Sequence, residues 1–364
     1  MTEPDFPRTL LPSRWRLPAL AFTLTLAACL GGESVARAET VADVAGPANA
    51  VLARLEERKA ALARAGASVV GVEVRALEDA RSIATLGPRR AGSGVVIGAD
   101  GLVLTIGYLI LEADRVDLVD GSGRHLPARV VAYDLASGFG LLQALTPLPL
   151  EPVPLGISAA VKGDEPLLVA SGGDEADLSL ARMVSRRPFS GYWEYHIDGA
   201  LFTAPARTDH SGAGLFNAEG ELVGIGSLMV TDAAGNAAMP VRGNMFVPVD
   251  LLKPILAELR ASGASRASTR AWLGLNCVEF GGHVRVIRLT SDSPAEEAGL
   301  EPGDLILAID GTPVSDLASF YKMLWRDPRA ERDVALDVRR GAESRRLTVR
   351  SVDRMKTLSR PQGV

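Results

Sequence analysis

The sequence predicts a mainly β protein with two domains behind an export signal. Short runs of β-forming residues, separated by glycine-containing turns, fill residues 68–247 without helical patterns between them. Many short strands in this arrangement are typical of antiparallel barrels or sandwiches. A small, polar stretch at residues 264–270 divides this region from a second pattern of strands and helices. With 364 residues and 47% hydrophobic side chains, the chain is long enough to form two cores.

The first 38 residues have the order of a secretory signal. Three arginines within the first 16 residues precede an uncharged apolar run at 17–30, and the small residues Ala36 and Ala38 follow. The run is shorter than the roughly 20 residues of a membrane-spanning helix. We therefore predict cleavage near Ala38 and a protein that is periplasmic or otherwise exported.

An alternative signal overlaps the apolar run. The string "LAAC" at residues 26–29 has the form of a lipobox, which would leave a lipoprotein anchored at Cys29. We favour cleavage after Ala38, because a four-residue box arises easily by chance in a run rich in alanine and leucine. Cys277 is then the single cysteine left, and its string "WLGLNCVEF" predicts a thiol buried in a strand.

Composition and motifs exclude several classes of function. The formal net charge of −5 makes the chain a poor candidate for binding nucleic acid. Its histidines and acids show no close spacing of the zinc or calcium type, so no metal is predicted. Neither "GxxxxGK[ST]" nor "GxGxxG" occurs, and no cofactor is predicted.

The elements follow in order along the mature chain. Residues 39–67 are predicted as a helical segment, because "VLARLEERKAALARA" combines strong helix formers with leucines at helical spacing. The β domain covers 68–263, includes a hairpin turn at 99–101, and closes with a helix that starts at Pro248 and ends at Gly263. A linker at 264–270, a second domain at 271–352 and a flexible tail at 353–364 complete the chain.

Several of these segments resemble one known family. The strings "GSGVVIGADGLVLT", "GLFNAEGELVGIGS" and "PVDLLKPIL", followed by "WLGL" and "SPAEEAGLEPGDLILAIDGTPV", are similar to those of the HtrA family of exported serine proteases. They occur in the same order over most of residues 68–350. The resemblance implies a chymotrypsin-like double β-barrel followed by an α+β PDZ domain. It also implies a serine endopeptidase ancestry.

The catalytic motifs are where the chain departs from that family. The family carries its catalytic histidine directly after the glycine-turn hairpin, and "TIGYLI" puts Tyr108 there. The string "DLASGFGLL" has Gly138 in place of the catalytic aspartate, whereas "DHSGAGL" retains the nucleophile as Ser211. Asp209 stands where the family has a glycine that donates its N–H to the oxyanion. These assignments follow from the resemblance.

The chemistry of these replacements predicts a loss of catalysis. Serine needs a base that accepts its proton near neutral pH, and a phenol with a pKa of about 10 is itself protonated there. Gly138 has no side chain to orient a base, and the Asp209 carboxylate is expected close to the developing negative charge. Loss of triad members costs on the order of a millionfold in turnover. We therefore lean towards a protein that is not an enzyme.

Other bases leave an active serine endopeptidase with a non-standard site as the rival interpretation. The four histidines are His125, His196, His210 and His283. The side chain of His210 is expected to diverge from that of its neighbour Ser211, and His125 and His283 are predicted to face solvent. His196 lies in a segment without a counterpart in the family, so it stays an open candidate.

The second domain carries the predicted binding site. Consecutive N–H groups of Leu273, Gly274 and Leu275 are predicted to bind a peptide's terminal carboxylate, while the peptide adds as a strand. Phe320 and Leu324 lie four residues apart on the helix at 316–325 and are candidates for the wall of an apolar pocket. Packing in the domain core is their alternative role.

These patterns together indicate an exported HtrA-like pseudoprotease. Its expected partners are unfolded or C-terminal polypeptide segments, with an active HtrA relative as a further partner. A purely structural envelope component is a third interpretation. HtrA relatives are commonly trimers, but the helix at 51–65 lacks aromatic anchors, so a homo-oligomer stays an open alternative.

Overall fold

The computed structural model describes residues 42–174 and 176–359, with side chains from residue 51 onwards. Residues Leu52–Val364 form one compact unit. The predicted cleavage site near Ala38 and the alternative lipid site Cys29 lie outside the described residues. Within the described part of the chain, no helix is both long and apolar enough to cross a membrane.

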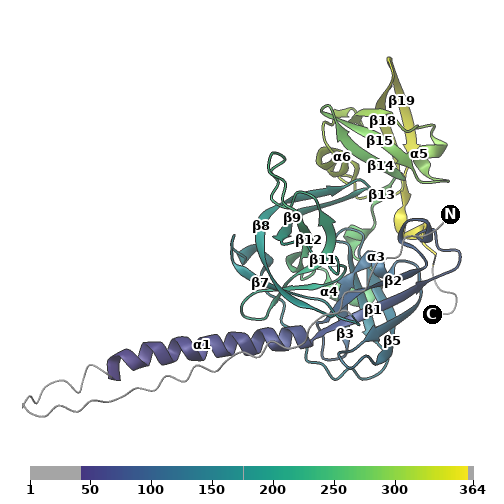
Figure 1. The fold of residues 1–364 in the computed structure, drawn as a ribbon. Helices are drawn as coiled ribbons and strands as arrows, with labels where there is room; N and C mark the ends of the chain where they lie inside the picture. The colour runs from purple at the N-terminus through teal and green to yellow at the C-terminus, as the bar shows by residue number, and fades with distance from the viewer. Residues whose placement is uncertain (1–41, 175, 360–364) are drawn as a thin grey trace, which may run out of the picture. The chain divides into compact units, whose positions relative to one another are not determined.

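The first half of the compact unit contains a closed antiparallel barrel (Figure 1). Its strand order is β1-β2-β3-β6-β5-β4. The tight turn between β2 and β3 contains Gly101 at φ 81°, so the predicted hairpin is present. In chain order the strands are Val69–Ala76 (β1), Arg89–Val96 (β2), Leu102–Ile106 (β3), Ala113–Val119 (β4), His125–Tyr133 (β5) and Phe139–Ala144 (β6).

A second closed antiparallel barrel follows, with the strand order β10-β11-β12-β9-β8-β7. Buried side chains of both barrels, among them Phe139 and Phe202, belong to one hydrophobic cluster. The two closed barrels confirm the mainly β prediction. The strands are Pro166–Ala170 (β7), Leu178–Gly191 (β8), Tyr195–Ala204 (β9), Gly214–Phe216 (β10), Leu222–Val230 (β11) and Gly243–Pro248 (β12).

Helical segments before residue 264 are mostly short. The long helix at Ala42–Ala67 (α1) contains the predicted segment 51–65. The helix predicted from Pro248 begins later, because Pro248 is extended and pairs with Gly224 as the last residue of β12. Gly263, at φ 77°, is the left-handed C-cap of its final part, as predicted. The remaining elements are Ile83–Leu86 (α2), Gly107–Ile110 (α3), Ser158–Ala160 (η1), Val249–Leu251 (η2) and Leu256–Ser262 (α4).

The segment predicted as a linker, 264–270, is fastened to the first barrel. It contains a short 3-10 helix at Arg266–Ser268 (η3), and its buried serines Ser265 and Ser268 each donate a hydroxyl hydrogen bond to Asp134 Oδ1 at 2.5 Å. The other oxygen of Asp134 accepts from the N–H and the hydroxyl of Ser137. Four donors therefore surround one buried carboxylate of the first barrel. Two of them come from the segment that leads into the second domain.

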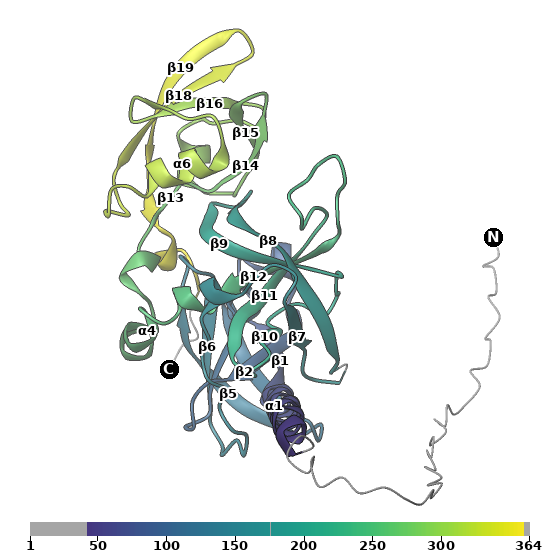
Figure 2. The same cartoon turned by 90° about the vertical axis from the view of Figure 1, so that its left-hand side faces the viewer.

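The second domain has the α+β organisation that the sequence predicted. A sheet in the order β14-β15-β16-β18-β19 is accompanied by a helix, α6, that contacts β14 and β16 (Figure 2). Asp316 caps α6 in a capping box with Ser319, and Cys277 is buried in β14, as predicted. The elements are Ala271–Trp272 (β13), Leu275–Phe280 (β14), His283–Leu289 (β15), Pro294–Glu297 (α5), Leu305–Ile309 (β16), Thr312–Pro313 (β17), Leu317–Leu324 (α6), Asp333–Arg340 (β18) and Glu343–Arg350 (β19).

The chain after β19 is ordered further than the flexible tail that the sequence predicted. Val352–Asp353 (β20) pairs with β13, and a 3-10 turn at Arg354–Lys356 (η4) follows. The N–H of Ser359 donates to Glu112 Oε1 at 2.9 Å. The difference arises because a short polar segment without periodicity can still pair with a strand formed much earlier in the chain.

Candidate catalytic and peptide-binding sites

Ser211 lies in a tight turn between β9 and β10 that the backbone holds from both sides. The carbonyl of Ser211 accepts from the N–H of Ser93, and the N–H of Gly212 donates to the carbonyl of Gly226, both at 2.8 Å. Gly212 has φ 75°, and a Cβ there would lie 2.0 Å from the carbonyl oxygen of Ser93. Only glycine fits this position, which is why a serine followed by glycine forms the turn.

The structure brings Tyr108 and Ser211 together. Tyr108 belongs to α3, the single helical turn that follows β3. Its hydroxyl oxygen lies 2.8 Å from Ser211 Oγ and 2.9 Å from the carbonyl oxygen of Ser227. The phenol therefore has two hydrogen-bond neighbours and one proton to donate.

The protonation of Tyr108 determines what Ser211 can do. Burial raises the pKa of Tyr108 to about 12, and the hydrogen bond with Ser211 opposes this rise only in part. At neutral pH the phenol is protonated, and it cannot accept the serine proton in an acid–base step. Tyr108 therefore offers Ser211 Oγ a hydrogen-bond donor and not a base.

Gly138 lies close to Tyr108 through the backbone. Its carbonyl accepts from the N–H of Gly107 at 2.7 Å, and its φ is 82°. A Cβ at this position would lie 3.1 Å from the hydroxyl oxygen of Tyr195, which donates to the carbonyl of Ser137. A tyrosine thus fills the space beside Gly138.

The loop before β14 holds a carboxylate from elsewhere in the chain. The N–H of Leu273 donates to Glu194 Oε1 at 3.0 Å, and the N–H of Gly274 donates to Glu194 Oε2 at 3.1 Å. Burial raises the pKa of Glu194 to about 7, and the N–H of Leu275, together with those of Leu273 and Gly274, opposes this rise. The three residues predicted to bind a carboxylate therefore surround the side chain of Glu194, a residue that the sequence analysis did not single out.

Comparisons with known proteins agree with this architecture. A family model for the trypsin-like peptidase domain matches residues 92–225, and one for the PDZ domain matches residues 271–350. The "Probable periplasmic serine endoprotease DegP-like" of Ectopseudomonas mendocina is 29% identical over 262 residues, or 68% of this chain and 54% of that protein. The "Serine protease HTRA2, mitochondrial" of Bos taurus is 30% identical over 292 residues, or 72% of this chain and 60% of that protein. The chain belongs to the HtrA family.

This HtrA chain spans little more than half the length of those curated relatives. Among solved structures, the HtrA-type protease AlgW with decapeptide aligns at 19% identity with a TM-score of 0.52, over 84% of this chain and 99% of that one. The serine endoprotease from Yersinia pestis aligns at 21% identity with a TM-score of 0.51, over 81% and 97%. At these identities the likeness shows a shared HtrA fold.

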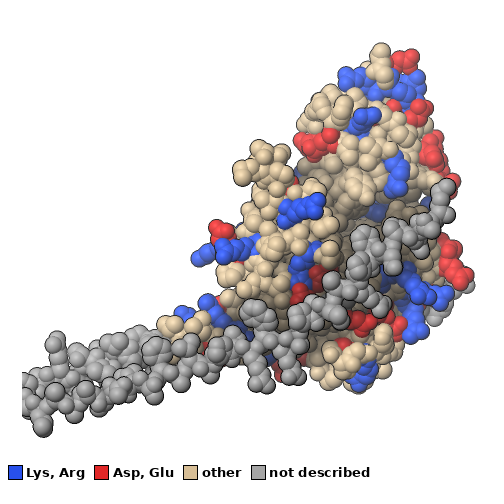
Figure 3. Space-filling view, viewed as in Figure 1, with Lys and Arg blue, Asp and Glu red and all other residues tan. Residues whose placement is uncertain are grey.

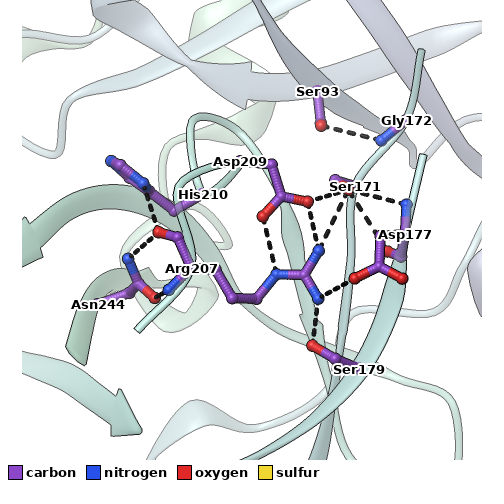
Figure 4. A network of polar contacts seen from close by, with 9 residues as sticks. All are labelled: Ser93, Ser171, Gly172, Asp177, Ser179, Arg207, Asp209, His210 and Asn244. Atoms are coloured by element: carbon purple, nitrogen blue, oxygen red, sulfur yellow. Dashed lines mark hydrogen bonds and ion pairs between the residues drawn. The ribbon is translucent and has the colours of Figure 1, made fainter. Parts of the chain in front are cut away.

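The carboxylate of Asp209 lies in a network of polar contacts around Arg207 (Figure 4). It accepts hydrogen bonds from Arg207 and from the hydroxyl of Ser171. Arg207 also contacts Asp177 at 3.0 Å and the hydroxyl of Ser179. Because the guanidinium offers several donors in one plane, it draws the carboxylate to itself.

The pKa of Asp209 makes this pair a source of pH-dependent stability. Burial raises the pKa, but hydrogen bonds from Arg207 and Ser171 outweigh burial, so the net pKa lies below the usual 3.8. A lowered pKa stabilises the fold above the unfolded value, and the effect disappears as pH falls through the folded value.

We expect Asp209→Asn to lower the free energy of unfolding by about 1 kcal/mol at pH 7, and to lower it by less near pH 2. Urea denaturation at the two pH values measures both quantities. Asp177→Asn removes the exposed partner of the same arginine and is the matched control, expected to have the smaller effect at pH 7. An equal loss of unfolding free energy in both variants would contradict the stabilising role of the Arg207–Asp209 pair.

Among the residues that the structure describes, no histidine ring is hydrogen-bonded to the Ser211 side chain. Three of the four rings have polar neighbours elsewhere in the described chain. His210 Nδ1 lies 3.0 Å from the carbonyl oxygen of Arg207, as Figure 4 shows. His196 Nδ1 lies 2.8 Å from the hydroxyl of Ser190, and burial lowers the pKa of this histidine. His125 Nδ1 lies 3.5 Å from Glu73 Oε2 on the barrel surface.

Phe320 and Leu324 are both fully buried on α6. Each belongs to the core cluster of the PDZ domain, so the packing role that the sequence left open is present. Their candidate role in lining a peptide pocket stays a prediction. The neighbouring Tyr321 is the α6 residue whose hydroxyl reaches the chain near Glu194, and periodicity alone did not single it out.

Charged side chains alternate in sign on the surface of this HtrA chain. Figure 3 shows basic and acidic groups interspersed on the visible face. In the PDZ domain Arg346 pairs with Asp337 at 2.6 Å, and Arg345 pairs with Glu343 at 2.6 Å. On β18 and β19, ion pairs are formed by Arg340, Arg345, Arg346 and Arg350. Among the described residues, no group of three or more His, Cys, Asp or Glu side chains could hold a metal ion.

Proposed function

We propose that this protein is an exported HtrA-like pseudoprotease that binds C-terminal or extended polypeptide segments through its PDZ domain without cleaving them. The observation that carries the proposal is the contact of the Tyr108 hydroxyl with Ser211 Oγ. The only titratable side chain recorded in hydrogen-bond contact with that oxygen, among the described residues, is a protonated phenol.

The rest of the site supports the same proposal. Nucleophilic catalysis by serine needs a base and a group that orients the base. Gly138 has no side chain, and the nearby Asp134 carboxylate is committed to the hydroxyls of Ser137, Ser265 and Ser268. An imidazole that could replace the base would have to leave its present hydrogen bond. These features favour binding over hydrolysis.

The PDZ domain supports the choice of ligand. Backbone N–H groups of Leu273 and Gly274 converge on one carboxylate in the structure, and this is the chemistry that a peptide's terminal carboxylate needs. The adjacent strand β14 lies at an edge of its sheet, where an extended peptide can add as a strand. The ligand class is therefore a polypeptide C-terminus.

Binding can be measured on the mature chain, residues 39–364. The probe is a fluorescein-labelled pool of random decapeptides that end in valine, as the free acid and as the C-terminal amide. We expect fluorescence anisotropy to show at least about tenfold weaker binding of the amide, because it lacks the charge that the N–H groups bind. Equal binding of acid and amide would contradict recognition of a C-terminus.

The place of the protein in the cell is part of the proposal. Curated relatives are named as periplasmic proteases, which agrees with an exported protein. Cleavage near Ala38 predicts Glu39 as the first residue, whereas the alternative predicts a lipid on Cys29. An active HtrA relative is a proposed partner, and self-association through the start of the peptidase domain is a proposed alternative to a monomer.

A further inference from the structure

The turn between β8 and β9 contains a buried carboxylate in an unusual backbone conformation. Glu194 is 6% exposed and has φ 57°, which non-glycine residues adopt rarely. Burial of an ionised carboxylate is costly unless hydrogen bonds compensate. Here the compensation comes from Leu273 and Gly274, which each donate a backbone N–H to one of its oxygens.

The backbone of the same turn contacts the edge strand of the PDZ sheet. The N–H of Cys277, in β14, donates to the carbonyl of Tyr192 at 2.8 Å. This is a main-chain hydrogen bond of the kind that a peptide makes when it extends a sheet. It uses a donor that an incoming peptide strand would need.

The helix α6 contacts the turn as well. The hydroxyl of Tyr321 donates to the carbonyl of Gly191 at 2.8 Å and accepts from the N–H of Glu194 at 3.2 Å. Lys322 and Asp198, on α6 and β9, form an exposed ion pair at 3.3 Å. Residues 191–194 therefore meet the loop, the strand and the helix that make up the predicted groove.

We propose that residues 191–194 are an internal ligand of the PDZ domain, in which the Glu194 carboxylate takes the place of a peptide's terminal carboxylate. An external polypeptide C-terminus binds by displacing this turn. This inference rests on the proposed function, because the displacing ligand is the one proposed there.

The energetics of the internal carboxylate allow displacement. Burial raises the pKa of Glu194 to about 7, although the N–H groups of the loop and the charge of Arg354 oppose the rise. The ionised form is thus less stabilised in the loop than it is in water. A peptide's terminal carboxylate has an ordinary pKa of about 3.3–3.7, so it brings its charge at neutral pH more readily.

The test uses the mature chain with Glu194→Gln, which keeps the size of the side chain and removes its charge. Glu194→Gly, which tolerates the left-handed backbone, is the second variant in case the first fails to fold. Asp337→Asn is the matched control, since Asp337 lies in the PDZ domain and pairs with Arg346, away from the turn and the loop. Hydrogen exchange of the amides in 271–277 and anisotropy with the valine-ending acid pool are measured on each protein.

We expect both Glu194 variants to exchange the amides of Leu273 and Gly274 at least about tenfold faster, and to bind the peptide pool about tenfold more tightly. Asp337→Asn should change neither quantity by more than about twofold. Unchanged exchange in both Glu194 variants would overturn the internal ligand, even if peptides bind. Faster exchange without peptide binding to any protein would support the internal ligand and overturn the proposed peptide-binding function.

Discussion

The purified mature chain is expected to leave unfolded casein intact, and the Ser211→Ala variant is expected to behave in the same way. The reason is the Tyr108 phenol, whose pKa of about 12 keeps it protonated beside Ser211 Oγ at neutral pH. Loss of the base and of its orienting group corresponds to a deficit on the order of a millionfold in turnover. Gel electrophoresis after prolonged incubation with labelled casein measures the result.

The matched control is Tyr108→Phe, which removes the hydroxyl and keeps the ring. It is expected to be as inactive as the parent, because the hydroxyl supplies no base. Cleavage of casein by the parent that disappears in Ser211→Ala would contradict the pseudoprotease proposal. Cleavage that persists in Ser211→Ala would indicate a contaminating protease. The contaminant is then removed by repurification before the comparison is made.

Restoration of the site is the second prediction with a large effect. The combined variant Tyr108→His, Gly138→Asp, Tyr195→Phe and Asp209→Gly supplies a base, its carboxylate and an oxyanion donor. Tyr195→Phe is included because the Tyr195 hydroxyl lies 3.1 Å from the position of a new Cβ at Gly138. We expect a fluorophosphonate to label Ser211 about a hundredfold faster than in the parent.

The backbone limits how complete this recovery can be. Gly138 has φ 82°, so an aspartate there costs about 1–2 kcal/mol, although aspartate tolerates this region better than most residues. Each of the four single variants is expected to label at the parent's rate, since triad members act as a unit. Labelling of the parent as fast as the combined variant would show that another residue already activates Ser211.

The parts of the fold that depend on local pattern were accessible from the sequence. Glycine turns and short β-type runs predicted antiparallel barrels or sandwiches, and the family resemblance implied the double barrel. Gly263 marked the end of α4, as its left-handed φ requires. The predicted helix start at Pro248 was one residue early, since the 3-10 turn begins at Val249 and the fixed φ of proline also suits the end of an extended strand. Pairing with Gly224 of β11 keeps Pro248 in the strand. That pairing joins residues that are not neighbours in the sequence.

The parts of the sites that depend on side-chain partners were not accessible. "RTDHS" contains an arginine two residues before an aspartate, which could have signalled the Arg207–Asp209 pair. Glu194 carried a weaker signal, a single acid within an aromatic turn. Its role depends on a contact with a loop almost 80 residues later, and no periodicity or motif encodes such a contact.

The Asp134 cluster sets the length of the tether between the barrels and the PDZ domain. Ser268 is the last residue held by that carboxylate, and β13 begins at Ala271, so two residues, Thr269 and Arg270, are left to span the gap. The three Cα-to-Cα steps from Ser268 to Ala271 reach about 11 Å when fully extended. A tether this short gives the Glu194 turn an effective concentration of millimolar order or above at its loop. In the proposed displacement, an external peptide would compete with this local concentration as well as with the contact itself, so only tight-binding ligands would displace the turn.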